Sequence, residues 1–167
     1  MLALLAMAGA ALSACSPTAE PSPTPTAAFA SEEEAFAAAE ETYRAYNDAV
    51  NQKRDGDENA DPQSFLTGLA LENDIEAIQL LKSEGVHVAG HGELIAFNPE
   101  QANVHSMSAK VIATICLDVE ATRVLNDRNE DVTPQNRPLV VGLEVEFVGT
   151  QDGLMISDSN ENPVDQC

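Results

Sequence analysis

His87 and His91 are the first candidates for metal chemistry, because their spacing of four residues resembles a ligand pair on a helix. They fall, however, in a segment whose apolar residues alternate with a period of two, which is typical of a β-strand. Four residues of extended strand span about 13 Å, so the two rings are too far apart to hold one ion. His91 and Glu93 share a face and can meet, but the sequence offers them no third ligand. We therefore predict no metal site.

Two acidic segments imitate the start of a calcium-binding loop. Residues 158–162 have the D-x-N-x-N spacing, but Pro163 stands where the loop needs a glycine. Residues 55–59 show a similar spacing, but Ala60 replaces the glycine and Leu66 replaces the final glutamate. Both segments are therefore interpreted as polar turns rather than as calcium sites.

Cys15 has a different chemistry, which is set by the residues before it. Residues 1–12 form a run of twelve without a polar or charged side chain. Such a run is too short to span a bilayer, but it has the length of the apolar region of a secretory signal peptide. It ends in Leu12-Ser13-Ala14-Cys15, which resembles the bacterial lipobox, where the cysteine receives a diacylglyceryl group and becomes the mature N-terminus. We expect residues 1–14 to be a lipoprotein signal peptide; a buried N-terminal helix with an unmodified Cys15 is the alternative.

The surroundings of this motif suggest how the chain is anchored. No Lys or Arg precedes Cys15, although signal peptides begin with a basic region, so either the true start codon lies upstream or the chain is truncated. Residues 15–30 contain four prolines among Ser, Thr and Ala, a composition that favours polyproline II or disorder. We therefore expect the lipid on Cys15 to be the contact with the cell membrane, and residues 15–30 to tether a single domain, residues 31–167, on its extracytoplasmic face.

The two remaining cysteines, Cys116 and Cys167, are left as a pair once Cys15 carries lipid. An exported protein meets an oxidising environment in which disulfides persist. Cys116 lies between Thr114 and Asp118 on the polar face of its expected strand, and a bond to Cys167 would fold the C-terminal tail across that face. Two free thiols are the alternative.

The overall charge excludes several classes of protein. The chain of 167 residues has 28 acidic and 8 basic side chains, which gives a formal net charge of −20. Nucleic-acid binding depends on neutralising phosphates with Lys and Arg, so this charge argues against it, as it does against adsorption to anionic lipid. An apolar fraction of 44% excludes a fully disordered chain. We expect a small acidic globular domain.

Three helices are expected in the first half of this domain. The sequence SEEE at residues 31–34 is a capping box, and apolar residues follow it at spacings of three and four over about twenty positions. This stripe consists of Phe36, Ala39, Tyr43, Tyr46 and Val50. Asp61 and Pro62 predict the start of a short second helix, and Asn73 that of a third, which ends at Gly85. The inward residues of these two helices are expected to be Phe65, Leu66, Leu69, Ile75, Ile78 and Leu81.

From residue 86 the apolar period changes to two, which predicts strands. The expected strands cover residues 86–96, with a bulge or bend at Gly90 and Gly92, residues 107–121, residues 139–147, and a last segment through Leu154 and Ile156. Their acidic residues fall on the polar, outer face; these are Asp118, Glu120, Glu144 and Glu146. Short turns and one polar face indicate an antiparallel sheet that is covered on one side. The predicted fold class is therefore α+β, with N-terminal helices packed on a curved antiparallel sheet.

This order of elements resembles the cone of the nuclear transport factor two-like family. The likeness is greatest to small actinobacterial lipoproteins that combine a lipobox, a Pro/Thr/Ser tether, a cysteine in a central strand and a cysteine at the chain end. The resemblance implies a cone that is either open as a pocket or filled by side chains. Tyr43 and Tyr46 are the candidates to line the mouth of such a pocket, and a place in the core is the alternative for both. The family includes isomerases, dehydratases and non-enzymatic modules, so the fold alone does not assign a function.

No catalytic residue is predicted. An enzyme of this fold needs an acid or a base inside its apolar cavity, whereas the inward strand positions are nearly all aliphatic. Walker, Rossmann and G-x-S-x-G patterns are absent from the sequence, and no cofactor is expected. We therefore expect a lipid-anchored envelope domain that binds a small molecule or another envelope protein, or that has a structural role. The alternative is an isomerase-like or dehydratase-like enzyme that acts on an apolar small molecule.

Overall fold

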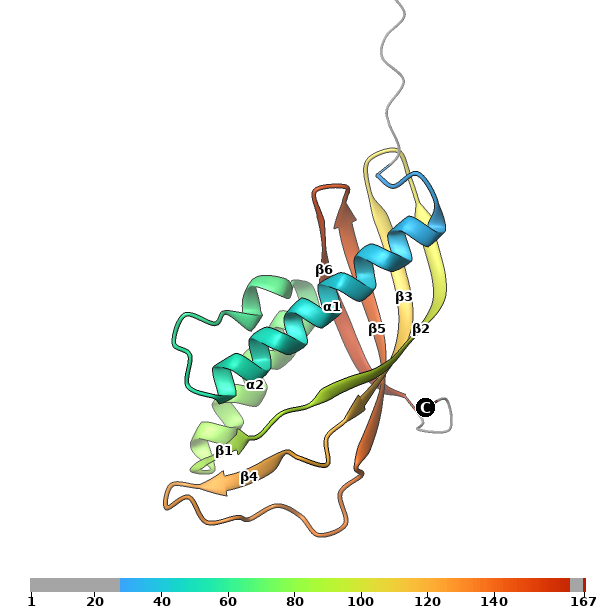
Figure 1. Ribbon diagram of the computed structural model, residues 1–167. Coiled ribbons are helices and arrows are strands. Elements are labelled where there is room, and N and C mark those ends of the chain that lie inside the picture. The colour runs from blue at the N-terminus through green and yellow to red at the C-terminus, as the bar shows by residue number, and fades with distance from the viewer. Residues whose placement is uncertain (1–27, 163–166) are drawn as a thin grey trace, which may run out of the picture.

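The computed structural model describes residues 28–162 and Cys167, and in this part of the chain two α-helices pack on a four-stranded antiparallel sheet (Figure 1). The sheet has the strand order β2-β3-β5-β6. Its strands are β2 (Glu93–Val104), β3 (Ala109–Asp118), β5 (Val140–Thr150) and β6 (Gly153–Asn162). The predicted α+β class, with helices on one face of an antiparallel sheet, is confirmed at this level.

Helix α1 (Glu32–Arg54) begins where the capping box predicts. The Glu34 backbone N–H donates to the Ser31 hydroxyl at 3.2 Å, and the Ala30 N–H donates to the Glu34 carboxylate at 2.6 Å. These bonds satisfy backbone donors that a helix start leaves without a partner. Acidic residues in the first turn and basic residues in the last turn suit the helix dipole. In Figure 1 the helix crosses the sheet diagonally.

The short second helix begins where it was predicted, at Pro62 after Asp61, whereas the third helix begins earlier than predicted. Residues Pro62–Phe65 form a short 3₁₀ helix, η1, and a single helix, α2 (Gly68–Ser83), covers the expected start of the third helix at Asn73. The helix starts earlier because Thr67 adopts an extended conformation before it, while Asn73 is tolerated inside. The apolar positions expected inward also differ, since Leu69 and Ile78 are 55% and 51% exposed.

The expected first strand, residues 86–96, is two strands in two sheets. Strand β1 (Val86–Ala89) pairs with β4 (Arg123–Asn126), which was not predicted, and together they form a separate ribbon. The break lies at Gly90, where φ is +78° and a Cβ atom would lie 2.3 Å from the Ala121 carbonyl oxygen. Only glycine fits so close an approach in this left-handed conformation.

Strand β2 extends through Pro99, farther than predicted. Proline has no N–H to donate to a neighbouring strand. This is tolerated because β2 is an edge strand that pairs only with β3, so no hydrogen bond is needed on its unpaired side. Register shifts at Ile95 and Glu100 interrupt the alternation of apolar and polar residues. These interruptions are the physical reason why the sequence pattern did not show this strand.

The interpretation of residues 158–162 as a polar turn was also wrong. They belong to β6, where Ser159 pairs with Val145 and Asn162 pairs with Gly142. Cross-strand pairing with β5 therefore outweighs the low strand propensity of the Asn and Asp residues at positions 158–162. The expected strand 107–121 was too long, since both of its ends lie outside β3.

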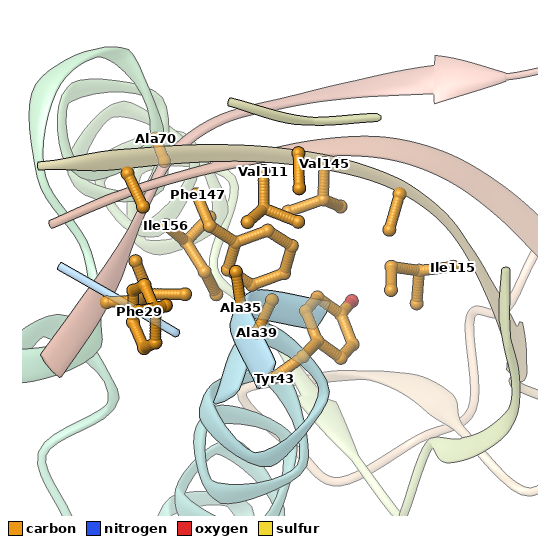
Figure 2. Packing of buried hydrophobic residues seen from close by; sticks show 14 of the residues in the cluster. Phe29, Ala35, Ala39, Tyr43, Ala70, Val111, Ile115, Val145, Phe147 and Ile156 are labelled. Atoms are coloured by element: carbon orange, nitrogen blue, oxygen red, sulfur yellow. The ribbon is translucent and has the colours of Figure 1, made fainter. Parts of the chain in front are cut away.

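The core lies between α1 and the inner face of the sheet, and Figure 2 shows its packing. Ala35 and Ala39 are fully buried, and their small side chains let the helix approach the sheet closely. Phe147 of β5 packs at the centre, 6.4 Å from the Tyr43 ring and 6.3 Å from the Phe97 ring between centroids. The alternating inward residues of β3 and β5 add Ala109, Val111, Ala113, Ile115 and Val145, as their period of two predicts.

The core also includes residues that the sequence placed in the tether. Ala28 and Phe29 are buried among the core residues, and the Ala28 N–H donates to the His105 carbonyl at 3.1 Å. The folded part of the chain thus begins before Ser31, because an aromatic side chain at position 29 has apolar surface to bury.

Candidate ligand-binding cavity

A cavity of about 310 Å³ lies between the two helices and the sheet. Its volume is at the small end of the range for ligand sites, roughly 300–1,000 Å³. Aliphatic and aromatic side chains form most of its wall, and polar groups come mainly from the helices. The wall consists of Tyr43, Tyr46, Asn47, Val50, Arg54, Leu66, Ala70, Asn73, Asp74, Ala77, Gly92, Leu117, Val119, Leu143, Ile156 and Ser159.

Both tyrosines named from the sequence lie in this wall. Tyr43 is only 3% exposed, and its ring meets that of Tyr46 edge to face with centroids 5.7 Å apart. Burial raises the pKa of the Tyr43 phenol, and the nearby Tyr46 adds to the effect. Burial also raises the pKa of Tyr46; the charge of Asp74 acts in the same direction and that of Arg54 opposes it. Both phenols are therefore neutral at neutral pH and able to donate a hydrogen bond.

Sequence reasoning missed the polar residues that α1 adds to the cavity, which are Asn47 and Arg54. A signal for them was present, because the stripe through Tyr43, Tyr46 and Val50 continues to position 54 at the same spacing. Arg54 is equally explained by its place in the last turn of the helix, where cations are common. Asp74 had no comparable signal, since it was expected in the first turn of a helix rather than inside one.

Arg54 is half-buried at the end of α1. Its Nη1 donates to the Gly90 carbonyl at 3.4 Å, and a Cβ atom at Gly92 would lie 3.8 Å from the same nitrogen. Burial lowers the pKa of the guanidinium, although Tyr46 opposes the change. None of the ion pairs found among the described residues involves Arg54. The cavity wall therefore holds a partly desolvated positive charge that no carboxylate within residues 28–162 neutralises directly.

The backbone around this arginine is held in place by two amide side chains of α1. Asn47 and Asn51 both donate from Nδ2 to the Gly92 carbonyl, at 3.0 Å and 2.9 Å, and the Gly92 N–H donates to the Asn51 Oδ1 at 3.1 Å. The loop between β1 and β2 is thereby fixed against the helix. Side chains at this end of the cavity are positioned by a hydrogen-bonded frame rather than by a free loop.

Asp74 belongs to the other helix that encloses the cavity. Its Oδ2 accepts a hydrogen bond from Gln63 Nε2 at 2.9 Å, which ties α2 to η1. Arg54 and Asp74 thus enter the cavity from different helices without forming an ion pair with each other. The cavity has a cationic group in its α1 wall and an anionic group in its α2 wall.

The remaining candidates from the sequence lie elsewhere. His91 Nε2 is 2.9 Å from both carboxylate oxygens of Asp55, and both side chains are exposed. Within the described residues, no three His, Cys, Asp or Glu side chains gather in a way that would hold a metal ion. On the outer face of the sheet, Glu146 forms an ion pair with Lys110 and accepts a hydrogen bond from Ser157.

Cys116 and Cys167 form the predicted pair. Their Cα atoms are 5.7 Å apart, a separation typical of a disulfide, and the bond joins positions 51 residues apart in the sequence. Cys116 is fully buried beside Thr114 on the outer side of β3. Cys15 lies outside the described residues, and no helix within residues 28–162 is long and apolar enough to cross a membrane.

Comparison with known proteins gives this chain no relative from which a role could be transferred. Protein-family models, curated proteins and solved structures were compared with it, and none of them matches. Any function for the cavity has to be derived from its own volume, lining and charge.

Proposed function

We propose that this chain is a lipid-anchored extracytoplasmic domain of the nuclear transport factor two-like type, which binds a small, mainly apolar molecule without transforming it. The observation that carries the proposal is the cavity of about 310 Å³, whose apolar wall is interrupted by a few fixed polar groups. This combination is typical of small-molecule sites, in which apolar surface provides affinity and a few polar groups provide orientation.

Binding without catalysis is supported by the residues that the sheet supplies. The described strand residues in the wall are Leu117, Leu143, Ile156 and Ser159, so the sheet contributes no acid or base to the cavity. The acid in the wall, Asp74, accepts a hydrogen bond from Gln63, which fixes its place between α2 and η1. General acid–base chemistry works best with a group whose pKa lies near the working pH, whereas burial raises the pKa of both phenols in the wall away from neutral pH.

A cavity-filling substitution tests the binding. Ala77 lines the open side of the cavity on α2, so Ala77→Phe should cover it, whereas Ala37→Phe adds the same ring at an exposed position of α1 that does not line the cavity. With n-octanol as an apolar probe, titration calorimetry should show saturable binding to the native protein and to Ala37→Phe. Ala77→Phe should bind at least about tenfold more weakly, which is a loss of about 1.4 kcal/mol. No binding to the native protein, or equal binding by Ala77→Phe, would contradict the proposal.

Membrane anchoring is supported by the sequence around Cys15. The lipobox-like residues before it and the proline-rich tether after it suit a lipoprotein, and a net charge of −20 leaves the acyl chains as the expected membrane contact. Expressed in a host that processes lipoproteins, the protein should partition with membranes and into detergent, while Cys15→Ala should be released. Retention of Cys15→Ala in the membrane fraction, at the level of the native protein, would rule out this anchor.

A further inference from the structure

We propose that Arg54 forms an anion site inside the cavity, so that the ligand is a small amphiphile with a carboxylate head and an apolar body. This proposal rests on the proposed function, since it requires that the cavity binds a ligand. It adds the chemical class of that ligand and the residue that selects it. The juxtaposition that carries it is a partly desolvated guanidinium beside an apolar cavity, with no carboxylate of the described part of the chain paired to it.

The unneutralised charge of Arg54 is the first step. Removing a charged group from water costs free energy unless the group is paired, and a half-buried arginine normally faces a carboxylate. Among the described residues the only hydrogen bond of the Arg54 side chain runs from Nη1 to the Gly90 carbonyl, and at 3.4 Å it is long. A guanidinium has five N–H donors, so most of its hydrogen-bonding capacity is left for a ligand.

The neighbours of Arg54 suit an anionic head group. Tyr46 lies in the same wall, and its neutral phenol is a hydrogen-bond donor. Gly92 has no side chain to fill the space near Nη1, where a Cβ atom would be in ordinary contact at 3.8 Å. Asn47 and Asn51 hold this glycine through its carbonyl, so the space is part of a fixed frame. A planar carboxylate fits the fork of a guanidinium better than a spherical anion does.

The charge of the rest of the molecule favours a single negative charge on the ligand. Asp74 lies in the α2 wall, and the chain has a net charge of −20, so a doubly charged phosphate would be repelled more strongly than a carboxylate. Repulsion by Asp74 also orients the ligand, because it drives the head toward α1. The apolar body then lies along Leu117, Leu143 and Ile156 of the sheet.

Comparing a carboxylate with a neutral molecule of the same chain length tests the site. We would titrate octanoate and n-octanol into the native protein, Arg54→Gln and Arg44→Gln, at neutral pH by calorimetry. Arg44 is the matched control, since it lies on the same helix and loses the same charge, but it is exposed and paired with Glu40 at 2.6 Å. The native protein should prefer octanoate over n-octanol by about tenfold or more. Arg54→Gln should lose this preference while it still binds n-octanol, and Arg44→Gln should keep it.

The outcomes separate this proposal from the one on which it rests. Binding of n-octanol as tightly as octanoate by the native protein would overturn the anion site while leaving the cavity as a binding site. A preference that persists in Arg54→Gln, or that vanishes equally in Arg44→Gln, would overturn it as well, and would leave Arg54 as a structural tie to the Gly90 carbonyl. Failure of both probes to bind would remove the proposed function itself. Should Arg54→Gln not fold, the side-chain NMR signal of Arg54 in the native protein tests the anion site instead. This signal should shift when octanoate is added and should not shift when n-octanol is added.

Discussion

At the scale of single residues, burial rather than residue type sets the chemistry of the cavity. Tyr43 and Tyr46 are the only tyrosines of the chain, which has no tryptophan, so ultraviolet absorbance follows their ionisation alone. Because burial raises the pKa of both phenols, their absorbance should change at a pH above about 10, the ordinary value for tyrosine. A pH titration of the folded protein measures this, and in denaturant both should ionise near the ordinary value.

The same shifts make stability depend on pH in a defined direction. A pKa that is raised in the folded state means that folding favours the neutral phenol. The stabilisation is therefore fully present below a pH of about 10 and is lost as the pH rises through the folded-state values. Tyr46→Phe serves as the control, because it should leave a single ionisation, that of Tyr43. An ionisation near pH 10 in the folded native protein would show that the phenols are exposed.

At the scale of elements, the junction between β1 and β2 determines how the polar end of the cavity is built. Gly90 has φ of +78°, and an added Cβ would lie 2.3 Å from the Ala121 carbonyl oxygen, so Gly90→Ala forces the backbone to move. Gly56→Ala is the matched control, since Gly56 has φ of +91° with nothing within 4 Å of the Cβ position. We expect Gly56→Ala to lower the free energy of unfolding by about 1–2 kcal/mol and Gly90→Ala by more than about 3 kcal/mol.

Denaturant unfolding of the two variants measures this difference. Comparable losses would mean that the approach to Ala121 relaxes without cost, and that backbone conformation alone explains both glycines. A larger loss for Gly90→Ala would also bear on the cavity, because the Gly90 carbonyl is the backbone partner of Arg54.

The elements that the sequence predicted well are those with an uninterrupted period. Helix α1 carries a capping box and a long apolar stripe, and β3 and β5 alternate over their buried length, so local pattern and tertiary packing agree. The errors fall where they conflict. Asn73 and Asp74 looked like a helix start but lie inside α2, and Pro99 and two register shifts disguised β2. Two of the polar cavity residues, Asn47 and Arg54, were missed although the stripe on α1 could have indicated them, whereas Asp74 depended on the helix boundary that was mispredicted.

At the scale of the whole molecule, the cysteine pair joins the C-terminus to a central strand. Cys116 lies in β3 outside the core cluster and is bonded to Cys167, so the bond is on the outer side of the sheet rather than on the side that holds the cavity. Disulfide formation and ligand binding therefore use opposite faces. Substitutions at the cysteines should change stability and leave binding of a cavity ligand unchanged.

Replacing both cysteines by alanine should thus lower stability through the unfolded state. The bond closes a loop between positions 51 residues apart, which in the chain-entropy treatment stabilises the folded state by about 4 kcal/mol. In denaturant unfolding, Cys116→Ala/Cys167→Ala should have a lower midpoint than the native protein, and a steeper dependence on denaturant, because its unfolded chain is more expanded. Reduction of the native protein should reproduce the lower midpoint, which separates loss of the bond from loss of the Cys116 side chain in its buried position. An unchanged midpoint in both experiments would show that the bond does not form in solution, whereas a loss seen only in the double variant would assign the effect to packing around Cys116.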